Sequence, residues 1–248
     1  MFPWIHGWVD TERTPQANTR LGMALAFVAG ATNAGGFLAV GEYTSHVTGV
    51  VSAVADSLVL GHTEVALGGL AMLASFVLGA MTTAILVNWG LRRELYTAYG
   101  LPLLLEAALL LLFGVFGGAM NYATYFFTPL TVTLLCFIMG LQNAVITKIS
   151  RAEIRTTHLT GLVTDMGIEL GKLAYINPAN SPSPVHANTQ KLRLQGLLIG
   201  SFVLGALVGA MGFKTLGFIT TVPLALTLLL LIAQPLWQDG TRWYKRAH

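Results

Sequence analysis

The sequence predicts an all-α membrane protein built from two copies of one helical unit. Three observations lead to this prediction: an apolar composition, six long apolar segments, and four short features that recur in the same order. Of the 248 residues, 54% are hydrophobic and only 10% are charged, whereas soluble domains carry roughly 25% charged residues. A soluble fold of this size cannot cover so much apolar surface, so we expect lipid to cover part of it.

Six segments are each long and apolar enough to span a bilayer, which requires about 20 residues. Two further segments, 44–61 and 157–175, are apolar but interrupted. The second of them contains a histidine, two acids and a lysine, so it is a poor candidate for a helix that faces lipid. The six predicted spans are 21–41, 65–90, 100–120, 128–147, 194–213 and 216–236.

Four sequence features recur in the same order in both halves, which indicates an internal duplication. We therefore expect a first transmembrane repeat at 21–120 and a second at 128–236, with a cytoplasmic arm at 1–20 and a cytoplasmic basic tail at 237–248. The paired features are Gly-Ala-Thr-Asn-Ala at 30–34 with Gly-Leu-Gln-Asn-Ala at 140–144, His-Val-Thr-Gly at 46–49 with His-Leu-Thr-Gly at 158–161, Ser-Phe-Val-Leu-Gly-Ala at both 75–80 and 201–206, and Pro102 with Pro223 before Leu-rich segments.

The basic residues indicate whether the interrupted segments cross the membrane, because Lys and Arg favour the cytoplasmic side. If neither segment crosses and the N-terminus is inside, 13 of the 14 Lys and Arg residues lie inside and only Lys214 lies outside. The split is 8 to 6 if both segments cross and 11 to 3 if only the first crosses. We therefore predict six transmembrane helices plus two half-helices or re-entrant helices. They would form two inverted three-helix repeats in an inner membrane, with both termini cytoplasmic.

Both interrupted segments begin with His-x-Thr-Gly. Inverted repeats with broken helices are common in transporters, where half-helix N-termini point at a central site. Such termini carry unpaired N–H groups and a partial positive charge, so they suit an anion or a carboxylate-bearing solute. The alternative is that Thr and Gly only pack a tight helix crossing. The predicted substrate-binding residues are His46, Thr48 and Gly49 on one side and His158, Thr160 and Gly161 on the other.

Other polar residues lie within the apolar segments. Asn33 and Asn143 occupy equivalent places, and each either holds its own interrupted segment in place or contacts the solute; we favour the first interpretation. Asp165 and Glu169 follow His158 by 7 and 11 positions. On a helix this spacing places the three side chains within about 20° of one another. We predict the two acids as proton-coupling residues, with a solvated surface face as the alternative.

Several functional classes lack their signatures in this sequence. There is no phosphate-binding P-loop, no HExxH and no GxSxG motif, so we expect no enzyme activity and no cofactor. The single cysteine, Cys136, excludes an intrachain disulfide, and the six scattered histidines predict no metal site. The basic residues lie in loops rather than in one stripe, which argues against nucleic-acid binding.

The Gly-Ala-Thr-Asn-Ala motif at 30–34 and the Ser-His-Val-Thr-Gly-Val motif at 45–50 resemble the pattern of the YoaK-like family of bacterial inner-membrane proteins, a domain of unknown function. The resemblance covers about residues 20–236 and implies a multi-pass, transport-related protein with no established substrate. Two positions depart from the family pattern. Asn33 stands where the family often has Asp, and Val50 stands where it often has Asn, and either change can alter charge coupling or solute choice.

Together these features predict a secondary transporter of a small polar solute, with anions as one candidate class. Alternating access would come from rocking one repeat against the other, with proton coupling as a further hypothesis. A passive channel lined by the same helix starts is one alternative. A non-transporting accessory or scaffold protein is another. The expected partners are the lipid bilayer and a small-molecule solute, and a homo-oligomer is left open.

Overall fold

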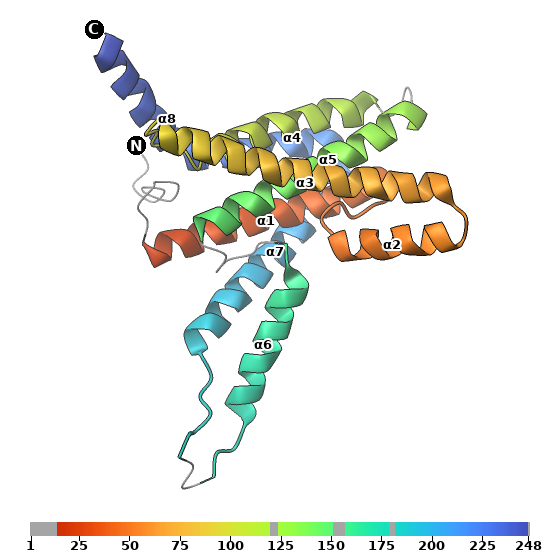
Figure 1. The fold of residues 1–248 in the computed structure, drawn as a ribbon. Coiled ribbons are helices and arrows are strands. Elements are labelled where there is room, and N and C mark those ends of the chain that lie inside the picture. The colour runs from red at the N-terminus through yellow and green to blue at the C-terminus, as the bar shows by residue number, and fades with distance from the viewer. Residues whose placement is uncertain (1–13, 120–123, 151–156, 179–181, 248) are drawn as a thin grey trace.

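The computed structural model describes residues 14–119, 124–150, 157–178 and 182–247, and these residues contain helices and no strands (Figure 1). The predicted all-α class is therefore confirmed. Residues 1–13 of the predicted arm, and Arg151 and Arg155 of the predicted cytoplasmic basic residues, lie outside the described residues. The helices are α1 (Pro15–Val40), α2 (Val47–Val59), α3 (Thr63–Arg92), α4 (Leu101–Ala119), α5 (Thr124–Ile149), α6 (Leu159–Ala174), α7 (Thr189–Leu216), the 3₁₀ turn η2 (Gly217–Thr220) and α8 (Thr221–Ala247).

Four helical stretches of the described chain are long and apolar enough to cross a membrane, by length and composition. They are Gln16–Val40, Thr63–Arg92, Thr128–Ile149 and the 55-residue run Thr189–Trp243, which includes α7, η2 and α8. The α2 helix and residues Leu101–Gly117 of α4 are shorter apolar helices. These helices are consistent with a membrane protein, while the count of six spans stays a prediction.

The α1 helix begins and ends with standard capping residues. Thr14 caps its N-terminus by accepting a hydrogen bond from the Ala17 N–H at 3.2 Å, and Pro15 opens the first turn. Gly41 ends the helix with φ of 76°, and its N–H donates to the Phe37 carbonyl at 2.8 Å. This left-handed conformation favours glycine. It turns the chain sharply towards the start of α2.

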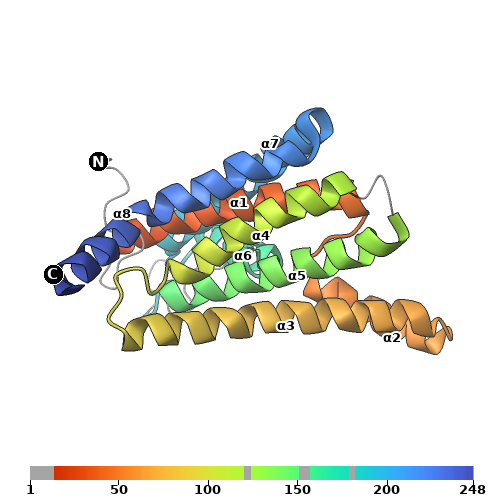
Figure 2. The same ribbon diagram turned by 90° about the horizontal axis from the view of Figure 1, so that it is seen from above.

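The interior of the bundle is formed mainly by α1 and α5. Half of the most apolar window of α1 and 61% of that of α5 are buried, compared with 17% for α3. The α3 helix therefore lies at the periphery and leaves most of its apolar surface uncovered. Seen from above, α1, α3, α4 and α5 lie alongside one another (Figure 2). Fully buried large side chains in the centre include Leu21, Leu25, Leu103, Leu110, Phe113, Leu135, Ile138, Met139 and Ile146.

Two close helix crossings join the halves of the chain, because α1 packs most extensively on α7 and α3 packs most extensively on α5. Glycines make both crossings tight. A Cβ added at Gly30 of α1 would clash with the Phe202 carbonyl of α7, and one added at Gly205 would clash with the Phe27 carbonyl. Equivalent clashes would occur between α3 and α5, at Gly79 with the Phe137 carbonyl and at Gly140 with the Phe76 carbonyl. Small residues allow membrane helices to approach this closely.

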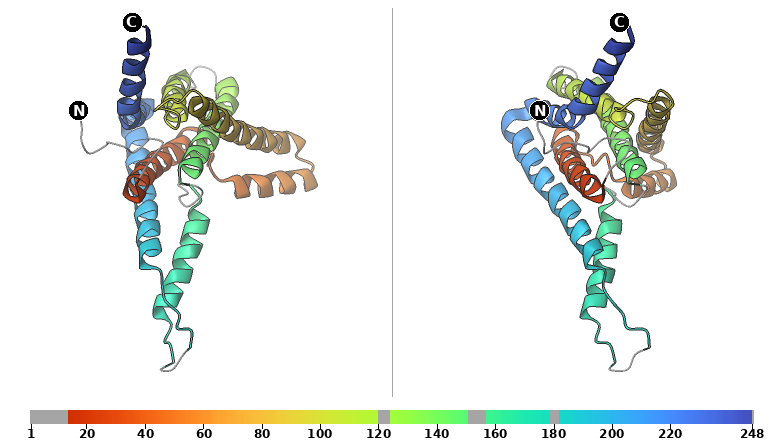
Figure 3. Two further views of the ribbon diagram at one scale, coloured as in Figure 1. Left: turned by 60° about the vertical axis from the view of Figure 1, so that its left-hand side comes forward. Right: turned by 90° about the vertical axis from the view of Figure 1, so that its left-hand side faces the viewer.

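The short helices α2 and α6 each pack against the long helix that follows them in sequence. The α2 helix lies along the first part of α3, and α6 lies along the first part of α7 (Figure 1). The pair formed by α6 and the beginning of α7 projects away from the rest of the bundle (Figure 3). The bounds of α2 and α6 fall inside the interrupted segments 44–61 and 157–175.

The predicted basic tail is helical as far as Ala247, because α8 continues through it. Its base is fixed to the loop between α3 and α4. The Asp239 carboxylate accepts hydrogen bonds from the backbone N–H groups of Tyr96 and Thr97, both at 2.9 Å. Arg242 forms an ion pair with Glu94 at 3.0 Å. These contacts hold residues 239–242 of α8 beside the loop that follows α3.

Candidate functional site

A cavity of about 390 Å³ lies where the starts of α2 and α6 meet the middle of the bundle. Its volume falls within the range of roughly 300–1,000 Å³ that is typical of small-molecule sites. Five of the predicted site residues line it, and they come from α1 and from the starts of α2 and α6. The lining residues are Asn33, Tyr43, Ser45, His46, Val47, Thr48, Phe76, Thr157, His158, Leu159, Thr160 and Phe202.

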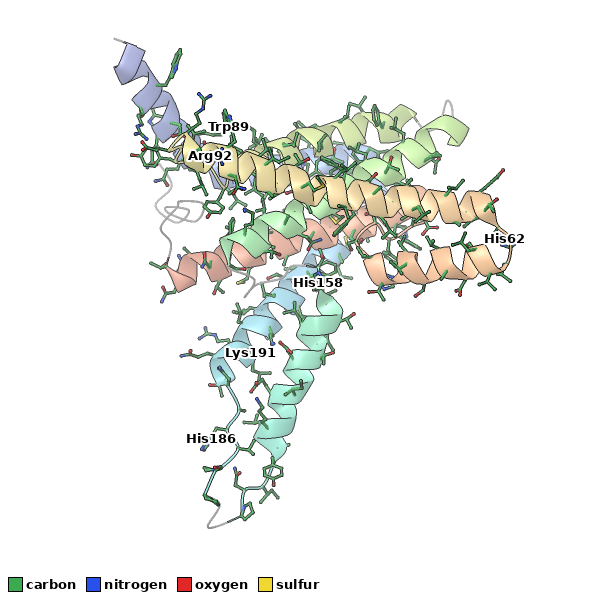
Figure 4. All side chains as sticks on the ribbon, in the orientation of Figure 1. His62, Trp89, Arg92, His158, His186 and Lys191 are labelled. Atoms are coloured by element: carbon green, nitrogen blue, oxygen red, sulfur yellow. The ribbon has the colours of Figure 1, made fainter. Side chains whose placement is uncertain are left out.

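The cavity lies midway along the long helices. Phe76 is the fourteenth of the 30 residues of α3, and Phe202 is the fourteenth of the 28 residues of α7. His158 accordingly appears between the two ends of α3, which His62 and Arg92 mark (Figure 4). The cavity therefore lies near the middle of α3 and of α7.

The helices α2 and α6 begin at the cavity in the same way. His46 and His158 are the N-cap residues, and neither side chain forms a capping hydrogen bond. The first helical bonds run from the Val50 N–H to the His46 carbonyl and from the Leu162 N–H to the His158 carbonyl, both at 3.1 Å. The N–H groups ahead of these have no intrahelical acceptor. Each helix start therefore offers backbone donors and a partial positive charge to the cavity.

The two glycines of the His-x-Thr-Gly motifs differ in their surroundings. A Cβ added at Gly49 would clash with the imidazole of His46, so this ring lies against Gly49. A Cβ added at Gly161 would meet nothing within 4 Å. Neither glycine is among the cavity-lining residues, although both lie in the first helical turn beside it. At Gly49 the absence of a side chain leaves room for the histidine ring.

Asn33 and Asn143 each accept a hydrogen bond from the segment that precedes a short helix. The Ser45 hydroxyl donates to Asn33 Oδ1 at 2.9 Å, and the Thr157 hydroxyl donates to Asn143 Oδ1 at 2.5 Å. These contacts agree with the interpretation that each asparagine holds its own interrupted segment in place. Only Asn33 also lines the cavity.

Three aromatic rings also line the cavity, although none of them was among the predicted site residues. Phe76 and Phe202 are the second residues of the repeated hexapeptide Ser-Phe-Val-Leu-Gly-Ala, so that repeat was the signal that could have identified them. Tyr43 stacks on Phe37 with ring centroids 4.4 Å apart and an interplanar angle of 14°. The cavity thus combines polar helix starts with aromatic walls.

Asp165 and Glu169, the predicted proton-coupling residues, lie outside the cavity lining and bind groups of the α6–α7 pair. Asp165 forms an ion pair with Lys191 at 3.0 Å. Glu169 is buried, accepts the Asn188 N–H at 2.7 Å and forms an ion pair with Lys172 at 2.9 Å. The Asn188 N–H and the Lys172 ammonium lower the pKa of Glu169 below its usual value. Both carboxylates therefore contribute to holding α6 near the start of α7.

Replacing Glu169 with glutamine is expected to loosen the start of α7. The lowered pKa of Glu169 means that its anion is favoured in the fold, so these contacts are present at neutral pH and are lost only as the pH falls below the usual glutamate range. Hydrogen–deuterium exchange at neutral pH should become faster around Asn188. Glu64→Gln is the matched control, because Glu64 is exposed and no ion pair with another described residue involves it. Equal exchange in the two variants would contradict the assignment.

Comparison with known proteins identifies the family of the chain. A family model described as "Protein of unknown function (DUF1275)" matches residues 21–234, so the chain belongs to this family. No curated protein and no solved structure matches the chain.

Proposed function

We propose that this member of the DUF1275 family is a secondary transporter of a small polar solute, with anions as the favoured class, in a bacterial inner membrane. Its resemblance to YoaK-like proteins favours the same setting. One observation carries the proposal: the starts of α2 and α6, which belong to different halves of the chain, line a single cavity with their His and Thr side chains. Sites where broken helices from two halves meet are a recurring feature of secondary transporters.

In the proposed topology the six long helices cross the bilayer, whereas α2 and α6 enter it without crossing. The 13 residues of α2 extend for roughly 20 Å at about 1.5 Å per residue, which is less than the ~30 Å hydrocarbon core. The 55-residue run of α7, η2 and α8 is long enough for two crossings. Outward-facing side chains such as Leu67 and Ile85, 66% and 64% exposed, would contact lipid. Both chain termini would then lie in the cytoplasm.

The proposed inverted repeats are supported by the reciprocal helix crossings. Gly30 and Gly140 hold equivalent positions in the repeated sequence, as do Gly79 and Gly205. Each glycine of one pair faces a phenylalanine carbonyl in the other half of the chain. These contacts between the two halves indicate two structural units. One contains α1, α6 and α7, and the other contains α2, α3 and α5. Each unit carries one short helix.

Alternating access would follow from rocking these two units against each other. The large glycine-mediated contacts lie within the units, whereas the contact between α1 and α5, which joins them, is less extensive. The cavity is lined by residues of both units, so their relative movement would open it to one side of the membrane and then to the other. Proton coupling through Asp165 and Glu169 stays a prediction. Their ion pairs favour a structural function for both acids.

Transport is tested by counterflow in proteoliposomes that contain the purified full-length chain. Vesicles are preloaded with unlabelled organic acids, amino acids or nucleobases in turn, and entry of the labelled form is measured against protein-free vesicles. A carrier accumulates label transiently against its gradient. Equilibration without accumulation would indicate a channel, and no flux for any solute would favour an accessory protein.

Substituting the cavity histidines should slow this transport. His46→Ala and His158→Ala each remove a side-chain hydrogen-bond partner worth roughly 1–1.5 kcal/mol, so the initial rate is expected to fall about tenfold. His62→Ala is the matched control. His62 is also an N-cap residue without a capping side-chain hydrogen bond, but it lies at the far end of α3 and does not line the cavity (Figure 4). Unchanged rates in both cavity variants would contradict the proposed site.

A further inference from the structure

The two equivalent asparagines use their amide groups differently. Asn143 is buried, its Oδ1 accepts from the Thr157 hydroxyl, and its Nδ2 donates to the Met139 carbonyl at 2.8 Å. Both ends of this amide are therefore engaged within the protein. Asn33 accepts from Ser45 through Oδ1 in the same way, but its Nδ2 makes no hydrogen bond to any described residue. Because Asn33 also lines the cavity, this donor remains for a bound molecule.

The two halves of the chain also contribute different numbers of aromatic side chains to the cavity. Phe76 and Phe202 occupy equivalent positions in the two halves and form walls of the cavity. Tyr43 adds a third ring next to the segment that Asn33 anchors. Its near-parallel stacking on Phe37, with ring centroids 4.4 Å apart, restricts the orientation of the tyrosine ring. Aromatic walls of this kind favour flat apolar groups, which they can contact by offset or edge-to-face packing.

The hydrogen-bonding groups of the cavity are weighted towards donors. The Asn33 amide nitrogen and the free N–H groups at the starts of α2 and α6 can only donate. The Ser45 and Thr157 hydroxyls donate their protons to Asn33 and Asn143, so towards a bound molecule they can only accept. The amide nitrogen and the N–H groups of the two helix starts outnumber these two acceptors. A molecule that presents oxygen acceptors would therefore satisfy more of these groups than one that presents N–H donors.

We propose that Asn33 is the specificity-determining residue of this cavity, and that the solute is a small organic molecule with a carboxylate on a planar apolar body. The Asn33 amide nitrogen binds a carboxylate oxygen, and the body lies among Tyr43, Phe76 and Phe202. Asn143 does not bind the solute and instead holds the segment before α6. This inference rests on the proposed function for the location of the site. It assigns different functions to two asparagines that occupy equivalent positions in the repeat: one binds the solute, and the other holds the structure.

Ligand-induced thermal stabilisation of the full-length protein in detergent tests this assignment, with benzoate as the probe. Benzoate should raise the apparent Tm by mass action. Asn33→Asp keeps the acceptor for Ser45 but replaces the donor with a carboxylate, so benzoate affinity should fall at least about tenfold. Asn143→Ala should lower the starting Tm yet keep the stabilisation by benzoate. Acetate, which has a carboxylate without the planar body, should bind more weakly than benzoate.

Three results would overturn the assignment: no stabilisation of the wild-type protein by benzoate, undiminished stabilisation of Asn33→Asp, or loss of stabilisation in Asn143→Ala. Failure of the transport proposal has a different signature. Benzoate binding that depends on Asn33, without counterflow of any solute, would refute transport and leave this inference standing. Counterflow of a solute of another class, without benzoate binding, would refute this inference and leave transport standing.

Discussion

Replacing Gly205 with alanine is expected to lower the free energy of unfolding by roughly 1–3 kcal/mol or more, because two helix backbones are in contact at this position. A Cβ at Gly205 would lie 2.7 Å from the carbonyl carbon and 2.8 Å from the Cα of Phe27, in addition to clashing with its oxygen. These are backbone atoms, so no side-chain rotation relieves the overlap. The α1 and α7 helices would have to separate along their whole contact.

The same helix provides the control for this substitution. Gly200 lies five residues earlier in α7, and a Cβ there would meet nothing within 4 Å. Gly200→Ala should therefore be neutral or slightly stabilising, since alanine exceeds glycine in helix propensity by about 0.8–1.0 kcal/mol. Thermal unfolding in detergent and the yield of monodisperse protein measure the difference. Equal stability of Gly200→Ala and Gly205→Ala would show that the helices do not cross at this glycine.

The crossings also explain why the cavity and the fold depend on each other. Gly30 and Gly140 approach the backbones of Phe202 and Phe76, and the side chains of these two phenylalanines line the cavity. A separation of the helices at either crossing would therefore move a cavity wall. For this reason Gly30→Ala is expected to disturb binding as well as folding, which makes Asn33→Asp the cleaner test of recognition.

Part of the site was predictable from short motifs. His46, Thr48, His158 and Thr160 were predicted as cavity residues from the repeated His-x-Thr-Gly motif, and all four line the cavity. The prediction depended on a local rule, namely that a helix start within an apolar protein exposes donors that need a partner. A local rule needs no knowledge of which helices pack together.

Other parts of the site depend on contacts between distant segments, which one sequence does not specify. Phe76 and Phe202 occur within apolar helices, where a phenylalanine usually indicates packing or lipid contact. Asp165 and Glu169 were predicted to share a helix face with His158; both acids contact the beginning of α7, whereas His158 lines the cavity. Their spacing alone did not reveal Lys191, which follows Asp165 by 26 positions. The pairing therefore changed the interpretation of both acids.

Cysteine labelling should place Arg20 and Arg92 on the same face of the membrane, and this result decides whether α2 crosses it. Two crossings, α1 and α3, separate these residues if α2 is a half-helix, whereas three separate them if α2 spans. Their side chains are exposed, and the native Cys136 is only 2% exposed, so background labelling should be low. A membrane-impermeant maleimide should label His62→Cys in intact cells, but label Arg20→Cys and Arg92→Cys only after permeabilisation.

The second half gives an independent version of the same measurement. Lys148 and Lys191 flank α6, so both substituted cysteines should be labelled from the cytoplasm, while Lys214→Cys in the last turn of α7 should be labelled from outside. The expected effect is all-or-none because each helix either crosses or does not. Opposite faces for Arg20 and Arg92 would make α2 a spanning helix and remove the half-helix that aims His46 at the cavity. Opposite faces for Lys148 and Lys191 would do the same for α6 and His158, and without both half-helices the arrangement that supports a central solute site would no longer exist.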